Sequence, residues 1–180
     1  KYYGKLNKKE TSMILYSKKI IVSPLTTHIP INKVKKYMNK TFIKKRINTV
    51  IMSLKKDFKL KKFKIAVSGL NPHAGENGNI GLEEKEIIAP IIKNFQKKGF
   101  KIVGPMPGDS IFLNNNMKKY DCILTIYHDQ ALIPFKIFNF IDGVNFTAGL
   151  DFIRTSPCHG TAYDIVGKNI GNEKSLLNAI

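Results

Sequence analysis

Short apolar runs alternate with segments of helical periodicity along this chain, and this alternation limits the fold more than any other feature. Runs typical of strands occupy residues 13–16, 19–24, 64–69, 101–103, 122–127 and 143–147. Helical patterns occupy residues 34–58, 82–98, 159–166 and 175–180. Strands that alternate with helices predict an α/β fold, a layered and largely parallel sheet with helices on both faces.

Two residues mark expected helix boundaries. Thr41 can cap a helix that begins at Phe42, because its hydroxyl can accept a bond from an amide of the first turn. Gly99 follows the second helical segment, where a C-terminal cap belongs.

The net charge of +17 lies in the first third of the chain. Residues 1–64 carry 19 basic and 2 acidic side chains, whereas residues 65–180 carry 11 of each. A basic front end can attract nucleic acid or an acidic membrane. However, 28 basic residues are lysine and only Arg46 and Arg154 are arginine, which specific phosphate and base readers favour. We therefore expect a solvated lysine surface and no nucleic-acid partner, with a basic nucleic-acid-binding module as the alternative of a different class.

Composition also argues against membrane and secreted classes. The apolar runs are far shorter than the ~20 residues that cross a bilayer. Two cysteines, Cys122 and Cys158, do not make a disulfide scaffold, and no secretion signal is visible. We expect a cytoplasmic protein without a membrane partner. The chain starts at Lys1 rather than Met and stops inside a helical pattern, so both ends are interpreted as truncations.

Three of the four histidines follow expected strands. His28, His73 and His128 lie in the loops after residues 24, 69 and 127, and ligands bind beyond the carboxyl ends of strands in such sheets. Neutral imidazole is the commonest side-chain metal ligand, and three would leave positions open for a substrate. Because spacings of 45 and 55 residues form no local metal motif, packing or capping roles stay open.

Five short motifs are distributed along the chain. They are TTHIP at 26–30, GLNPHAGE at 69–76, GPMPGD at 104–109, YHDQ at 127–130 and GLDFIRTS at 149–156. In order and spacing they resemble the 4-hydroxythreonine-4-phosphate dehydrogenase family of pyridoxal phosphate (vitamin B6) biosynthesis. The resemblance implies an isopropylmalate dehydrogenase-like fold, incomplete because the family's N-terminal region, with a His-Thr pair that contacts substrate, precedes Lys1.

The same resemblance implies two regions and a metal site. Residues 1–155 would hold most of the sheet with the metal and substrate site, and residues 156–180 a cofactor loop and helix of a largely missing lobe. In this family three histidines, matching His28, His73 and His128, bind one divalent metal at a homodimer interface, with ligands shared between the subunits. Zinc, cobalt and magnesium are the candidates.

The resemblance also implies which side chains contact the substrate. These correspond to Lys136, Asn145 and Arg154, and Asp109 matches an acid near the active site. Arginine can hold a phosphate or carboxylate by a bidentate fork, lysine as a point charge. Taken alone, Lys136 would be a solvated charge, Asn145 a turn residue and Asp109 a helix cap.

Residues 159–172 show a second resemblance, to the adenosine-binding loop of isopropylmalate and isocitrate dehydrogenases. It implies that the turn of His159 and Gly160 packs against adenine and that Asp164 bonds the ribose hydroxyls, which favours NAD over NADP. Thr161 and Asn172 belong to the same implied cofactor loop. A plain loop and helix is the alternative.

These resemblances imply an NAD-dependent, metal-dependent oxidoreductase. It would oxidise 4-phosphohydroxy-L-threonine to a 3-oxo acid that decarboxylates to 3-amino-2-oxopropyl phosphate, with the metal as Lewis acid. The general base stays open among Asp109, Lys136 and a water. Two alternatives remain: a related dehydrogenase for 4-phosphorylated threonate or erythronate or a dihydrodiol dicarboxylate, and a segment that folds but is inactive alone.

Overall fold

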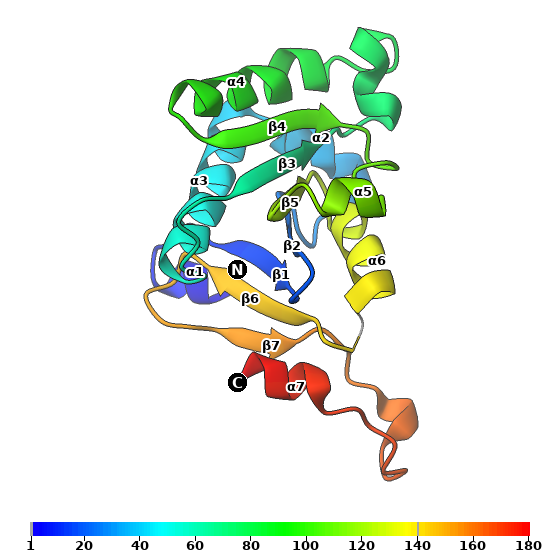
Figure 1. Cartoon of the computed structure of the whole chain (residues 1–180). Helices are drawn as coiled ribbons and strands as arrows, with labels where there is room; N and C mark the ends of the chain where they lie inside the picture. Colours follow the sequence, from blue (N-terminus) through cyan, green and yellow to red (C-terminus); the bar gives the residue numbers. More distant parts are fainter. Residues whose placement is uncertain (1, 140) are drawn as a thin grey trace.

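The computed structural model describes residues 2–139 and 141–180, and these form a seven-stranded sheet in the order β4-β3-β5-β2-β1-β6-β7 (Figure 1). The strands are β1 (Ser12–Tyr16), β2 (Ile21–Pro24), β3 (Lys64–Ser68), β4 (Lys101–Met106), β5 (Cys122–Thr125), β6 (Val144–Ala148) and β7 (Thr155–Pro157). The helices are α1 (Tyr2–Leu6), α2 (Val34–Tyr37), α3 (Lys40–Lys56), α4 (Ala89–Lys97), α5 (Asn114–Met117), α6 (His128–Asn139) and α7 (Lys174–Ala179).

The sheet is mixed rather than largely parallel. Strands β4, β3, β5 and β2 pair in parallel, whereas β1 is antiparallel to both β2 and β6, and β6 is antiparallel to β7. The short link between β1 and β2 explains the change of direction, because strands joined by a tight turn can only run antiparallel. Ser17 closes this turn by accepting bonds from the Lys19 and Ile20 amides. The expected parallel sheet is confirmed for the half that carries the three histidine loops.

Helices cover both faces of the sheet, as predicted. One face packs against α3 and α4, whose side chains Ile43, Ile47 and Phe95 are almost fully buried. The other face packs against α6 through Ala131 and Phe135. The neighbouring strands β3 and β5 are therefore covered on both faces, and it is their ends that reach solvent.

The predicted helical segment 34–58 forms two helices, α2 and α3, and the second starts earlier than predicted. Helix α3 begins at Lys40, and its cap is Asn39, whose Oδ1 accepts a 2.9 Å bond from the Phe42 amide. The predicted Thr41 cap is therefore wrong, because Thr41 lies inside the first turn of α3 and Asn39 accepts the bond from the amide of that turn. Gly99 follows α4 with φ +82°, which confirms it as the C-terminal cap.

Two further segments depart from the sequence prediction. Residues 159–166 are not a helix: only a 3-10 turn forms, at Tyr163–Ile165, and Tyr163 is 81% exposed. Conversely, α6 was predicted only as a loop after residue 127, and Pro134 inside it weakens the helical pattern. None of the helices in the described part of the chain has the length and apolar character of a membrane span.

Candidate active site

Three neighbouring parallel strands carry the three predicted histidines at their carboxyl ends. Strand β5 lies between β3 and β2, and the loops that leave β3, β5 and β2 begin the segments with His73, His128 and His28. Parallel strands present these ends at one edge of the sheet. The prediction that the three loops share one edge is therefore confirmed.

His28 and His128 lie side by side, with 5.3 Å between their ring centroids. The pairing of β2 with β5 continues past the strands, because the Thr26 amide donates a 3.0 Å bond and its hydroxyl a 2.8 Å bond to the Ile126 carbonyl. These bonds bring the two loops together. Nδ1 of His128 lies 2.9 Å from Asp129 Oδ1. This contact orients the ring so that its other nitrogen, Nε2, can bind a ligand.

His73 lies in a turn of unusual backbone conformation. Five consecutive residues, His73 to Asn77, have left-handed angles, with φ between +44° and +79°. Only one of them is glycine, and a left-handed residue with a side chain costs about 1–2 kcal/mol. Such strain persists only where the surroundings over-determine it, and it concentrates at functional sites. The exposed imidazole of His73 is therefore carried by a backbone segment of unfavourable conformation.

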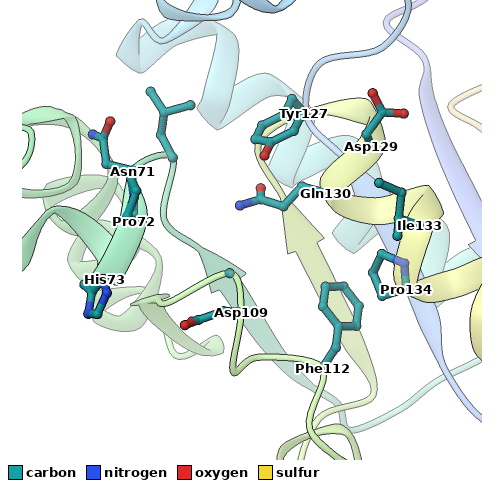
Figure 2. A pocket seen from close by; sticks show the side chains of 12 residues that line it. Asn71, Pro72, His73, Asp109, Phe112, Tyr127, Asp129, Gln130, Ile133 and Pro134 are labelled. Carbon is teal, nitrogen blue, oxygen red and sulfur yellow. The ribbon is translucent and has the colours of Figure 1, made fainter.

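A cavity of about 510 Å³ opens between the His73 turn and α6 (Figure 2). Its wall includes His73 on one side and Phe112 and Pro134 on the other. The Asp109 carboxylate is directed towards the side on which His73 lies, and the Gln130 amide extends into the space between the walls. Predicted site residues His73 and Asp109 therefore share one cavity.

Gln130 ties the ends of two strands together below this cavity. Its Oε1 accepts bonds from the Ser68 hydroxyl at 2.9 Å and from the Ile126 amide at 2.8 Å. Its Nε2 donates a 2.9 Å bond to the Gly69 carbonyl. The YHDQ motif contains Gln130, yet no role for this residue was predicted, since its partners Ser68 and Gly69 are 62 and 61 residues away in sequence.

A second cavity, of about 280 Å³, holds another part of the predicted site. His28, Asn145 and Arg154 line it together with Arg46. Nη1 of Arg154 donates a 3.1 Å bond to the Thr147 hydroxyl, which fixes one edge of the guanidinium. The predicted substrate contacts Asn145 and Arg154 are therefore brought together with one histidine of the close pair.

Arg46 was not predicted as a site residue, although it is one of only two arginines among 30 basic residues. It extends from α3 and forms a 3.2 Å ion pair with Glu10. Burial lowers the pKa of Arg46 from its usual value, and Glu10 partly offsets that effect. The rarity of arginine in the sequence could have indicated Arg46, but this residue lies among many lysines.

Lys136 is placed apart from both cavities. It lies on α6 but lines neither the His73 cavity nor the Arg154 cavity among the described residues. Its charge acts instead on Cys158, where burial raises the thiol pKa to about 11 and Lys136 opposes the rise.

The predicted cofactor residues form a separate group. His159, Gly160, Thr161, Asp164 and Asn172 are all exposed, in a segment that projects away from the sheet between β7 and α7 (Figure 1). Helix α7 returns to the sheet edge, where the Ser175 hydroxyl donates a 2.6 Å bond to the Gly143 carbonyl. The described chain thus does not bring the predicted cofactor residues together with the histidines.

The donor set fits a divalent cation in part. Zinc binds imidazole nitrogens at about 2.0–2.1 Å, so two rings as close as His28 and His128 can share an ion. Over residues 2–139 and 141–180, no three His, Cys, Asp or Glu side chains converge closely enough to hold a metal. A metal held by His28 and His128 would need further ligands from outside this pair, and ligands shared between two subunits would supply them.

Comparison with known proteins places these residues in context. The family model for "Pyridoxal phosphate biosynthetic protein PdxA" matches residues 2–180. The 4-hydroxythreonine-4-phosphate dehydrogenase of Aquifex aeolicus is 49% identical over 176 residues, which cover 96% of this chain and 53% of that protein. The chain therefore spans about half the length of the curated relatives it matches.

Solved structures show the same coverage. The crystal structure of 4-hydroxythreonine-4-phosphate dehydrogenase from Klebsiella pneumoniae matches with a TM-score of 0.84 and 39% identity, over 98% of this chain and 54% of that one. A terephthalate 1,2-cis-dihydrodiol dehydrogenase from Burkholderia xenovorans matches with a TM-score of 0.74 and 23% identity, over 93% of this chain and 53% of that one. At that identity the second likeness shows the fold alone.

Proposed function

The chain belongs to the PdxA family of pyridoxal phosphate biosynthetic proteins, and we propose that the whole protein is an NAD-dependent, divalent-metal-dependent dehydrogenase of 4-phosphohydroxy-L-threonine. The product is a 3-oxo acid that loses carbon dioxide to give 3-amino-2-oxopropyl phosphate. The observation that carries the proposal is the position of His28, His73 and His128 in the loops after three adjacent parallel strands, with His28 on the cavity that also holds Arg154 and Asn145.

His28, His73 and His128 are the proposed metal ligands, with the set completed between two copies of the chain. Zinc, cobalt or magnesium bound there would supply Lewis acidity that lowers the pKa of the substrate hydroxyl. The close pair His28 and His128 offers two nitrogens from one copy. Asp129 holds the second ring in place through its 2.9 Å contact with Nδ1.

Arg154 and Asn145 are the proposed anchors of the substrate. Thr147 holds one guanidinium nitrogen of Arg154, so the rest of the fork can receive a phosphate or a carboxylate. Asn145 offers a donor and an acceptor in the same cavity. Lys136 would act on the substrate only if closure or a partner subunit brings it to the cavity.

Asp109 is a candidate for proton transfer, because it lies on the His73 cavity and its carboxylate faces that side. A general base needs to reach the proton directly or through one water. Lys136 and a water remain the other candidates for this role.

The remaining parts of the proposal concern the cofactor and the assembly. Residues 159–172, within a region spanning 156–180, would bind the adenosine of NAD, with Asp164 accepting bonds from the ribose hydroxyls, and residues 1–155 would hold the metal and substrate. The assembly is a homodimer with the site at its interface, in the cytoplasm. The substrate is a small phosphorylated amino acid.

The test is NADH formation by the full-length protein with 4-phosphohydroxy-L-threonine, with and without added divalent metal. We expect metal-dependent NADH production. Turnover of 4-phosphorylated threonate or erythronate, or of a dihydrodiol dicarboxylate, without turnover of 4-phosphohydroxy-L-threonine would keep the site but replace the substrate. Absence of NADH with every substrate would contradict the proposal.

A further inference from the structure

We propose that Glu84 is the positioning residue of the His73 turn. It accepts bonds from the backbone that enters the turn, and its carboxylate lies close to Gly75 in the middle of the turn. The part of this inference that concerns metal binding rests on the proposed function. The part that concerns the shape of the turn stands on its own contacts.

Glu84 is a carboxylate placed where such groups rarely lie. It begins a π-helical turn, Glu84–Ile88, and only 4% of its surface is exposed. A buried carboxylate is costly unless hydrogen-bond donors surround it. A buried carboxylate with defined donors constrains the backbone segment that supplies those donors.

The donors all come from the entrance to the His73 turn. Oε1 of Glu84 accepts bonds from the Leu70 amide at 2.7 Å and from the Asn71 amide at 2.8 Å. Oε2 accepts a 3.0 Å bond from Asn71 Nδ2. Three donors from two consecutive residues fix the direction in which the chain leaves β3.

The same carboxylate also lies close to the middle of the turn and leaves no room there for a side chain. A Cβ on Gly75 would lie 2.6 Å from Glu84 Oε2, and a Cβ on Gly69 would lie 3.0 Å from Oε1. Gly75 is buried and has φ +79°. Glu84 therefore holds the turn at its entrance and supports it two residues beyond His73.

This arrangement explains how four non-glycine residues keep left-handed angles. The conformations of His73, Ala74, Glu76 and Asn77 are intrinsically unfavourable. The Glu84 bonds supply the external constraint that such a segment needs. Without them the turn would relax to right-handed angles, and the His73 imidazole would leave its place on the cavity wall (Figure 2).

Two measurements on the full-length protein test the proposal. Titration with Co²⁺ gives the metal affinity, and the visible bands of bound Co²⁺ report the ligand geometry. Hydrogen exchange followed on peptides gives the protection of residues 69–77. The variants are Glu84→Ala, Glu84→Gln and the control Glu86→Ala, which alters an exposed carboxylate of the same helical turn.

Glu84→Ala should weaken Co²⁺ binding about 10–100-fold, change the visible bands and speed exchange in residues 69–77. Glu84→Gln keeps an oxygen that can accept from both backbone amides, so its affinity should stay within about threefold of the wild type. Glu86→Ala should match the wild type in every measurement. If Glu84→Ala does not fold, Glu84→Asp carries the test, because it withdraws the acceptor by one methylene and should also weaken binding and speed exchange.

If residues 69–77 of a folded Glu84→Ala or Glu84→Asp variant exchange as slowly as in the wild type, Glu84 does not hold the turn and the proposal is overturned. Faster exchange with unchanged Co²⁺ affinity and bands would overturn the link to His73. If the wild type itself binds no Co²⁺, the proposed metal function fails, and the exchange result still decides whether Glu84 holds the turn.

Discussion

Two glycine-containing loops of this chain match family motifs, but only one of them is held in place by the rest of the fold. The loop at 69–78 receives bonds from distant elements: the Gly69 amide donates to Met106 in β4, and Leu70 and Asn71 donate to Glu84. In the loop at 158–172, the amides of Ile165 and Val166 donate to carbonyls three residues away.

The difference shows which functional groups this chain positions by itself. The His73 turn is strained and therefore needs its anchors, and all of them lie within the described residues. Among the described residues, the exposed segment with His159 and Asp164 is anchored near its ends, where the Cys158 amide donates to the Ser175 hydroxyl. We therefore expect the first loop to keep its shape without a ligand, and the second to acquire its shape when it binds one.

The largest expected effect comes from removing the imidazole of the anchored loop. His73→Ala should reduce metal-dependent turnover of the full-length protein about 1,000-fold, which corresponds to about 4 kcal/mol of transition-state stabilisation. The matched variant His159→Ala should mainly raise the KM for NAD, about tenfold, because it alters a binding contact. Both side chains are exposed, so the free energy of unfolding should change by less than about 0.5 kcal/mol. Retention of activity by His73→Ala would remove the metal assignment.

Glycine substitutions compare the two loops by stability. Gly75 and Gly167 have nearly equal angles, φ +79° and +76°, but a Cβ on Gly75 would meet Glu84 Oε2 and the Gly81 carbonyl, whereas nothing lies within 4 Å of one on Gly167. Gly167→Ala should cost about 1 kcal/mol for its backbone alone. Gly75→Ala should cost about 2–4 kcal/mol, because overpacking adds to the same backbone strain. Urea unfolding of the two variants measures the difference, and equal values would mean that the first loop is not tightly held.

Arg154 tests whether the substrate cavity is positioned as firmly as the His73 turn. Arg154→Lys removes the fork and the bond to Thr147, and should raise the KM for substrate about tenfold with little change in kcat. Thr147→Val, which leaves the guanidinium but frees it, should have a smaller effect in the same direction. Steady-state kinetics decide, and a Thr147→Val effect larger than that of Arg154→Lys would contradict the proposed anchor.

The smallest expected effect concerns the ion pair beside the anchored loop. Lys35 lies 2.8 Å from Glu83, and this contact, with a backbone bond and the bond from Asn71, lowers the Glu83 pKa to about 2. Because the pKa is lower in the folded state than the ordinary 4.5, the stabilisation is complete above about pH 5 and is lost as the pH falls towards 2. The stability difference between the wild type and Glu83→Gln should therefore be constant near neutrality and shrink below pH 4.5. Acid unfolding of both proteins measures this stability difference. A difference that does not change with pH would show that the Lys35–Glu83 ion pair is not its cause.

Much of the fold could be predicted from the sequence, because its signals are local. The apolar runs identified strands β1 to β6, and helical spacing identified α3, α4 and α7, whereas β7 was not predicted. The antiparallel pairing of β1 with β6 was not predicted, since it joins strands that lie far apart in the sequence. Helix α6 was missed because Pro134 interrupts its pattern.

The site was predictable as motifs but not as an arrangement. The resemblance named His28, His73 and His128, yet it did not show that two of them pair while the third shares a cavity with Asp109. Arg46, Gln130 and Glu84 were not predicted, because their importance comes from partners far away in sequence. Their roles appear only when the strand ends are brought together.

Hydrogen exchange of the wild-type, full-length protein, with and without NAD, tests the central comparison most directly. We expect the amides of residues 69–77 to exchange slowly in both conditions, because Glu84 and β4 hold them before any ligand binds. We expect residues 158–172 to exchange rapidly without NAD and more slowly with it. Equally rapid exchange of both loops without NAD would contradict the account, because it would mean that the fold does not preform the His73 turn.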